Sequence, residues 1–267
     1  MKLLEAIGGG VIRGLAYVGG FTIQGGSGLR AIPHVLPGVG KRGRWQAALR
    51  QMAAIGVDAL PMVGVMSVCT GFILAMQTGA ELRRFGALQY VMDTVAIGFT
   101  RELGPLLTAF VVSGRSGSAF SAEIGTMVVT NEIDALRTMA IDPIEFVLAP
   151  KYLAAIVTIP CLSIMSNAFG ILAGAGFMYI STKITLGMYL QYVANSIELH
   201  DVFVGLLKSL VFAVIIVNVG CLEGLRTRGG PDAVGRSATS AVVWSTFFVI
   251  LADVFFTAIF YLVHKGA

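Results

Sequence analysis

Charge is scarce in this sequence. Only 13% of its 267 residues are Asp, Glu, Lys or Arg, whereas 56% are hydrophobic and the mean hydropathy is +0.82. Soluble domains carry roughly 25% charged residues, so the composition excludes an ordinary soluble domain and predicts an all-α integral membrane protein. A membrane helix needs about 20 apolar residues, so the chain can supply about five spans and little else. Any catalytic domain is therefore expected on another chain.

Groups that carry chemistry are also few. The three cysteines have no paired spacing and are interpreted as buried thiols; they are Cys69, Cys161 and Cys221. The three histidines lie far apart and lack helix-spaced partners, which argues against a metal site; they are His34, His200 and His264. No GxSxG nucleophile motif is present. An enzyme is therefore disfavoured, and no cofactor is expected on this chain.

The small net charge does not indicate a nucleic-acid partner. A formal charge of +4 fits basic loops beside anionic lipid better than a nucleic-acid surface. Gly40-Lys41 resembles the end of a phosphate-binding loop, but Val35 stands at the place of the first glycine and Arg42 at that of the serine or threonine. We therefore expect no nucleotide site here, and we interpret the basic residues from Lys41 to Arg50 as an anchor to lipid headgroups.

Hydropathy divides the chain into an N-terminal segment and a transmembrane domain. Residues 1–54 mix apolar and charged positions and predict an amphipathic helix on the membrane surface. A signal peptide is the rival interpretation, which is disfavoured because Glu5 and Arg13 interrupt the apolar core. Residues 55–267 form the predicted transmembrane domain, with spans at about 59–78, 94–112, 150–180, 203–222 and 241–263.

The third predicted span contains two features that affect its packing. Pro160 predicts a kink. Gly170-x-x-x-Gly174 could form a flat face for close approach of another helix, or it could simply reflect how common small residues are in membrane helices. The sequence leaves these two interpretations open.

Lysine and arginine are distributed unevenly between the loops, and this predicts the orientation. Most of them fall in the N-terminal segment, in the loop between the second and third spans, and in the loop between the fourth and fifth. Only Arg83, Arg84, Lys183 and Lys265 would lie on the other side. The positive-inside rule therefore predicts a cytoplasmic N-terminus, and an odd number of spans predicts a periplasmic C-terminus.

A charged pair interrupts the second predicted span. Arg101 and Glu102 lie near its middle, where charge costs at least about 2.5 kcal/mol per residue. Neighbouring residues on a helix point in different directions, so the two side chains are not expected to share one partner. Gly104 and Pro105 follow directly; Pro105 removes a backbone hydrogen bond and predicts a kink beside the two charges.

The stretch after this span is polar but has a helical period. Apolar residues recur at spacings of three and four between Phe120 and Met139, which predicts an amphipathic surface helix over about 121–139. Asp142-Pro143-Ile144-Glu145 then combines a capping residue, a proline and an acid, and predicts a new helix start.

Four ordered motifs in this region carry a resemblance to a known family. TRELGP (Thr100–Pro105), GRSGSAFSAEIGTM (Gly114–Met127), NEIDAL (Asn131–Leu136) and Asp142-Pro143 together resemble the MlaE/YrbE permeases. These are membrane subunits of bacterial ABC systems that move phospholipids between the inner and outer membranes and maintain the lipid asymmetry of the outer membrane. The resemblance extends through most of the chain after about Gln46.

The resemblance implies a set of partners. It implies a homodimer of this chain in the bacterial inner membrane, with phospholipid as substrate. It further implies two ABC ATPase subunits that bind and hydrolyse ATP, a periplasmic substrate-binding protein with an MCE domain, and possibly a STAS-domain subunit. On this basis the helix over 121–139 is expected to couple the permease to the ATPase.

Two groups of residues are candidates for these roles. We hypothesise that Glu102 faces the lipid path while Arg101 is held by polar groups of neighbouring helices. The residues expected to contact the lipid beside them are Phe72, Leu74, Met76 and Gln77. The charged residues expected to pair with the ATPase are Glu123, Glu132, Asp134 and Arg137.

Two other classes of function compete with this one. A stand-alone ion-coupled carrier or channel could use Arg101 and Glu102 as its coupling charges. Carriers normally contain paired internal repeats with broken helices, and no second copy of TRELGP is present. An intramembrane enzyme would need nucleophile or metal-binding groups, which the sequence does not supply.

Overall fold

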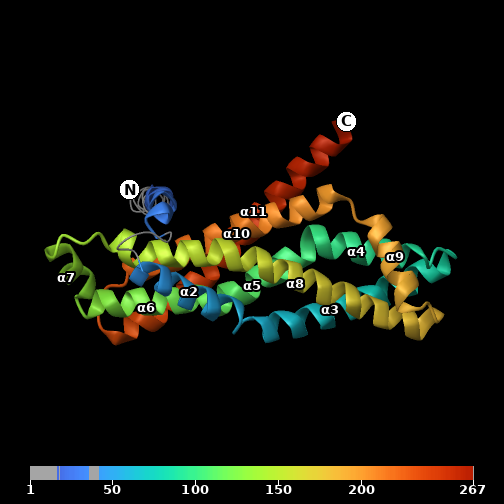
Figure 1. The fold of residues 1–267 in the computed structure, drawn as a ribbon, viewed down its shortest axis with the longest axis horizontal. Helices are drawn as coiled ribbons and strands as arrows, with labels where there is room; N and C mark the ends of the chain where they lie inside the picture. Colours follow the sequence, from blue (N-terminus) through green and yellow to red (C-terminus); the bar gives the residue numbers. More distant parts are fainter. Residues whose placement is uncertain (1–16, 18, 36–41, 267) are drawn as a thin grey trace, which may run out of the picture.

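The computed structural model describes Tyr17 and residues 19–35 and 42–266, and every regular element within them is helical. Five helical stretches there are long and apolar enough to cross a membrane, which confirms the expected all-α membrane class. They lie side by side in an elongated bundle (Figure 1). Residues 1–16 of the predicted surface segment and the Gly40-Lys41 stretch lie outside the described residues.

The first long stretch, Trp45–Arg84, contains two helices. α2 (Arg42–Gly56) runs along the bundle and packs against α8 (Ala149–Thr182), and α3 (Leu60–Arg84) follows after a short break. The membrane span was expected to end near residue 78, but the helix continues to Arg84. The polar residues after position 78 mark where the apolar segment ends, and they do not interrupt the helix itself. Glu81 and Arg84 pair at 3.4 Å on its last turn.

The second long stretch, Tyr90–Val129, is 40 residues long and nearly continuous. It consists of α4 (Tyr90–Gly98), α5 (Gly104–Val112) and α6 (Ser118–Val129). Two π-helical turns join them, η2 (Phe99–Leu103) and η3 (Ser113–Gly117). A π turn carries an extra residue between hydrogen-bonded groups, which accommodates Pro105 without breaking the helix.

The surface helix predicted over 121–139 is wrong as a single element. Residues up to Val129 continue the long helix, and Asn131, in the left-handed conformation with φ 60°, separates them from the short helix α7 (Glu132–Thr138). The apolar positions that suggested a stripe facing the membrane instead pack inside the bundle, where Phe120 and Ile124 are buried. Helical period alone does not distinguish a lipid-facing stripe from a core-facing one.

The third stretch begins where the sequence predicts it. The Asp142 carboxylate accepts a hydrogen bond from the Ile144 backbone N–H at 2.9 Å, and η4 (Ile144–Leu148) leads into α8. α8 contains Pro160 and packs most extensively against α3. A Cβ placed on Gly170 would lie 2.1 Å from the Phe99 ring, so this glycine permits a close helix approach. The small-residue face is therefore a packing surface.

The last part of the chain contains three helices. α9 (Leu186–Ser196) is a short helix in a region expected to be loop, and it lies across one end of the bundle, opposite α7 (Figure 1). α10 (Leu199–Leu225) starts with a capping box formed by Glu198 and Asp201. α11 (Pro231–Gly266) begins ten residues before the expected span, and its C-terminal part diverges from α10. We refer to the two ends as the α7 end and the α9 end.

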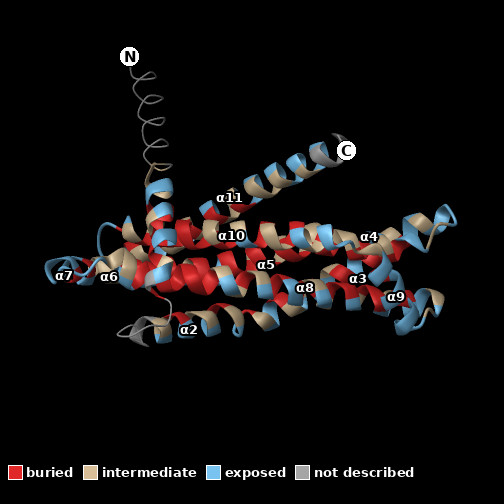
Figure 2. Ribbon diagram, turned by 45° about the horizontal axis from the view of Figure 1, so that its top comes forward, coloured by how far each residue is buried: buried red, intermediate tan, exposed pale blue. Residues whose placement is uncertain are grey.

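Burial differs strongly between these helices. Buried residues concentrate in the middle of the bundle, whereas much of α2, α3 and α11 is exposed (Figure 2). In the most apolar window of α10, 61% of the residues are buried, compared with 11% in that of α11. Apolar side chains on an exposed helix need lipid or another protein around them. α10 is thus an internal helix, and α11 presents most of its surface outward.

Candidate functional site

Five ionisable side chains meet inside the apolar bundle, between η2, α10 and α11. They are Arg101, Glu102, Asp201, Lys208 and Asp253. Charged residues within membrane helices are expensive and usually serve a function. Their convergence from three helices makes this cluster, which we call the charged cluster, the candidate site.

The π turn η2 presents two of these charges to different partners. Arg101 donates from Nε to Asp201, and Glu102 accepts from Lys208 Nζ. The Gly104 N–H bonds back to the carbonyl of Phe99, which is the five-residue step that defines the π turn. Such turns often occur at functional positions. The two neighbouring side chains do not share a partner, as the sequence predicts.

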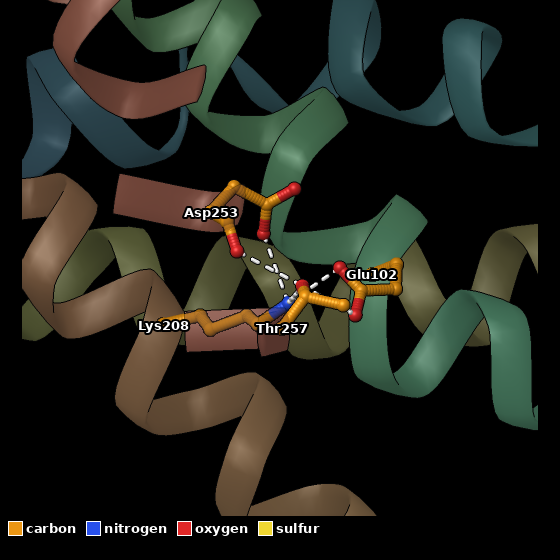
Figure 3. A network of polar contacts seen from close by, with 4 residues as sticks. All are labelled: Glu102, Lys208, Asp253 and Thr257. Carbon is orange, nitrogen blue, oxygen red and sulfur yellow. Dashed lines mark hydrogen bonds and ion pairs between the residues drawn. The ribbon is translucent and has the colours of Figure 1, made fainter. Parts of the chain in front are cut away.

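Lys208 is the centre of the cluster (Figure 3). Its Nζ donates to Glu102, to Asp253 Oδ1 at 2.9 Å and to Thr257 Oγ1 at 2.8 Å, so all three ammonium protons are used. The lysine is fully buried. Burying an ammonium group is tolerable only when its partners replace its lost hydration, and the two carboxylates meet that requirement.

Asp201 holds Arg101 by one nitrogen only. The carboxylate of Asp201 is buried and also accepts a hydrogen bond from the Glu198 backbone N–H at 3.0 Å. The Arg101 side chain is 39% exposed. Among the described residues no protein group bonds to its two terminal nitrogens. The guanidinium is therefore fixed at Nε. Its two terminal nitrogens, which we call the terminal fork, remain available to a ligand.

A cavity of 180 Å³ adjoins the charged cluster. Its walls come from η2, α10 and α11, and they are formed by Arg101, Glu102, His200, Val204, Thr257, Phe260 and Tyr261. The wall from η2 is charged, and the wall from α11 is largely aromatic. Pockets for drug-sized ligands have volumes of about 300–1,000 Å³. This cavity therefore suits a small polar group better than a complete lipid.

The apolar residues hypothesised to accompany Glu102 lie elsewhere. Phe72, Leu74, Met76 and Gln77 are on α3, which does not contribute to the described walls of this cavity. The Phe72 ring contacts the edge of Phe177, with centroids 5.8 Å apart. Leu74 packs against the α4 region, while Met76 and Gln77 are exposed. Within one chain, the structure does not bring this group to Glu102.

The residues hypothesised to contact the ATPase fall into two places. Glu123 on α6 pairs with buried Lys151 at 2.5 Å, so its charge already has a partner within the chain. Glu132, Asp134 and Arg137 lie exposed on α7. Asp134 and Arg137 pair with each other at 3.3 Å. Of these four residues, the three on α7 therefore lie together at the α7 end, whereas Glu123 lies on α6 with its charge paired to Lys151.

Sequence reasoning missed three members of the charged cluster. Lys208 and Asp253 lie inside the predicted fourth and fifth spans, so the rule that singled out Arg101 and Glu102 would have found them. Asp201 stands just before the predicted fourth span. Its signal was the capping pattern of an acid at residue 198 and another three residues later.

The sequence is similar to a known family of proteins. Residues 48–259 match the family model described as Permease MlaE. A probable ABC transporter permease protein of Rickettsia typhi is 36% identical over 80% of this chain and 82% of its own length. One of Synechocystis is 37% identical over 83% of each chain. The Arabidopsis thaliana chloroplastic protein TRIGALACTOSYLDIACYLGLYCEROL 1 is 32% identical over 81% of this chain and 62% of its own.

Proposed function

The chain belongs to the MlaE permease family of ABC transporters, and from this we propose that it is the membrane subunit that carries phospholipids between the inner and outer membranes of a bacterial envelope. In this role it maintains the lipid asymmetry of the outer membrane. ATP is bound and hydrolysed by a separate ATPase chain, and this chain supplies the path.

The observation that carries the proposal is the free terminal fork of Arg101 beside a small cavity in an apolar bundle. Arginine binds phosphate through two parallel N–H···O bonds, which are stronger than neutral hydrogen bonds. Asp201 fixes the guanidinium, so little conformational freedom is lost when a phosphate binds. A phosphodiester headgroup could enter the cavity while its acyl chains stay along apolar helix faces. The Arabidopsis relative is itself named for a glycolipid.

A homodimer would complete the path. The cavity lies where α11 diverges from α10, and α11 exposes a row of apolar side chains there, including Val254 and Phe255. A second copy could cover this face and enclose a volume large enough for acyl chains. The exposed α3 residues Phe72, Met76 and Gln77 could line the same volume from either copy.

The two ends of the bundle suit different partners. The exposed charges of α7 are available for the ATPase, with a STAS-domain regulator as a further possible subunit. The α9 end would then face the periplasm and an MCE-domain protein, with the N-terminus in the cytoplasm. Within the stretch Tyr90–Val129, the part from η2 to Val129 connects the charged cluster with α7, so a movement of the ATPase could reach Arg101 and Glu102 through one nearly continuous helix.

The buried ammonium–carboxylate cluster also supports a second candidate function. An ion-coupled carrier could use Glu102, Lys208 and Asp253 as groups that exchange partners during transport. Such a carrier would work without an ATPase. Membership in a family of ABC permeases favours the ATP-driven role.

The test is reconstitution of the full-length chain, alone and with a co-purified ATPase, in vesicles that contain phospholipid. We expect ATP-dependent lipid transfer only when the ATPase is present. Arg101→Lys should reduce co-purified lipid while the complex still assembles, because it keeps a positive charge beside Asp201 and removes the paired N–H donors that bind phosphate. Glu102→Gln keeps the size of the side chain and tests its charge separately. Transport by the chain alone, driven by an ion gradient, would favour the carrier instead.

A further inference from the structure

His200 adds a titratable group to a cavity whose fixed charges are unbalanced. Three carboxylates face two cations in the charged cluster. With the neighbouring Glu198 carboxylate, negative charge is in excess around His200 while the imidazole is neutral, and a proton on His200 reduces this excess. Histidine is the side chain that can change its charge within the physiological pH range.

The position of His200 allows it to act on a bound headgroup. It lies on the first turn of α10, directly before Asp201, and is exposed to the cavity that Arg101 and Glu102 line. Its ring meets the edge of Phe260 on the opposite wall, with centroids 6.0 Å apart. The charged and titratable groups around it are Arg101 and Glu102 from η2, Glu198, Asp201 and Lys208 from the α10 region, and Asp253 and Tyr261 from α11.

We propose that His200 sets the headgroup charge that the cavity accepts. This inference rests on the proposed function, because it assumes that a phospholipid headgroup enters the site. With neutral His200, the excess negative charge favours a zwitterionic headgroup, whose phosphate binds Arg101 and whose ammonium group faces Glu102. With protonated His200, the excess is smaller and an anionic phospholipid is repelled less.

The size of the effect follows from Coulomb interaction in a half-open site. Two unit charges a few ångströms apart still interact appreciably at the intermediate dielectric of a protein surface. We therefore expect the ratio of bound anionic to zwitterionic lipid to rise about threefold or more between pH 8 and pH 5.5. Phosphatidylglycerol stays anionic and phosphatidylethanolamine stays zwitterionic over this range, so the change comes from the protein.

The experiment uses the purified full-length chain with equal amounts of phosphatidylethanolamine and phosphatidylglycerol, and counts the bound lipids by mass spectrometry at both pH values. His200→Gln, which is always neutral, should keep the pH 8 ratio throughout. His200→Arg, which is always positive, should keep the low-pH ratio throughout. As a matched control, Leu199→His in the His200→Gln background places an imidazole on the neighbouring exposed residue and should not restore the pH response.

The outcomes separate this inference from the proposed function. A pH response that persists in His200→Gln, or a wild-type ratio that does not change with pH, overturns the role of His200 while leaving phospholipid binding intact. A well-folded wild-type chain that binds neither phospholipid at either pH contradicts the proposed function itself. Yield and elution volume of each variant show that it is folded.

Discussion

Two groups of polar side chains connect helices inside the bundle, and we call them joints; they differ in how their members are paired. One is the charged cluster around Lys208, and the other is a neutral joint around Asn218 on α10. In the neutral joint, Asn218 Nδ2 donates to the Phe21 carbonyl at 2.8 Å, and the Tyr152 hydroxyl donates to Asn218 Oδ1 at 2.9 Å. Gln24 Nε2 donates to the Asn218 carbonyl at 3.3 Å. This joint ties the N-terminal helix, residues 19–31, to α8 and α10.

Close packing surrounds the neutral joint. A Cβ on Gly28 would lie 2.4 Å from the Tyr152 ring, and one on Gly25 would lie 2.7 Å from Asn218 Nδ2. Tyr152 and Asn218 are both buried. The N-terminal helix thus reaches the bundle only because glycine occupies these positions, and it lies outside the residues 48–259 that match the family model.

The difference between the joints distinguishes a structural contact from a candidate site. In the neutral joint the two side-chain amides donate to backbone carbonyls, the Tyr152 hydroxyl donates to Asn218 Oδ1, and glycines close the space around them. In the charged cluster the terminal nitrogens of Arg101 have no partner among the residues that the structure describes, and a cavity lies beside them. Buried polar groups that are fully paired stabilise a fold, whereas groups with unused bonding capacity beside a cavity are available to a ligand. Variants at four places, namely Lys208, Gly28, Tyr152 and α7, test this comparison.

The largest effect is expected at Lys208. Lys208→Met removes the ammonium group and leaves Glu102 and Asp253 facing each other without a cation. Breaking one side of a buried ion pair typically costs about 3–5 kcal/mol, so the yield of folded protein should fall sharply. Thermal unfolding monitored by size-exclusion chromatography measures this. Adding Asp253→Asn should recover part of the loss, and no recovery would show that the two residues do not act as a pair.

A second large effect is expected at Gly28, with Gly26 as its control. Gly28→Leu would force a side chain into the Tyr152 ring, and overpacking typically costs about 1–3 kcal/mol or more. Gly26→Leu makes the same chemical change two residues earlier, where nothing lies within 4 Å of an added Cβ. It should be neutral or slightly stabilising because leucine favours a helix. Protease sensitivity of the N-terminal segment reports its docking; equal sensitivity of the two variants would contradict the packing role of Gly28.

A smaller effect is expected at Tyr152. Tyr152→Phe removes one neutral hydrogen bond, to Asn218, and keeps the ring that packs on Gly28. Such a bond contributes about 0.5–1.5 kcal/mol. A modest fall in melting temperature with unchanged lipid content is the expected result. If this variant lost bound lipid as strongly as Arg101→Lys, the neutral joint would belong to the site, and the distinction between the joints would fail.

The smallest effect on stability is expected at α7. Reversing Glu132 and Asp134 to lysine alters exposed groups, and surface ion pairs contribute only about 0–1 kcal/mol. Folding and lipid binding should therefore stay normal, while association with the ATPase and transport are lost. Co-purification of the ATPase measures the association. Normal association in this double variant would remove α7 from the ATPase interface.

Much of the site could be predicted from the sequence, but the sequence did not show which of its charged residues contact one another. Arg101 and Glu102 stand out because charge in an apolar helix is rare, and the same signal exists at Lys208 and Asp253. Which of these charges meet depends on the helix faces that pack together, and Glu102 and Lys208 are 106 positions apart. The role of residues 121–129 also depended on packing, because a helical stripe of apolar residues is the same pattern whether it faces lipid or α10.

The sequence by itself determined the class of this protein, its five membrane helices and its family, because hydropathy, helix signals and short motifs are local properties of the chain. Only the tertiary structure decided that the second span continues through two π turns to Val129, that Asp201 fixes Arg101 at Nε beside a cavity, and that the N-terminal helix docks on Asn218. These features depend on contacts between residues far apart in the chain. Such contacts form only when whole helix faces meet, and local patterns do not specify which faces those are.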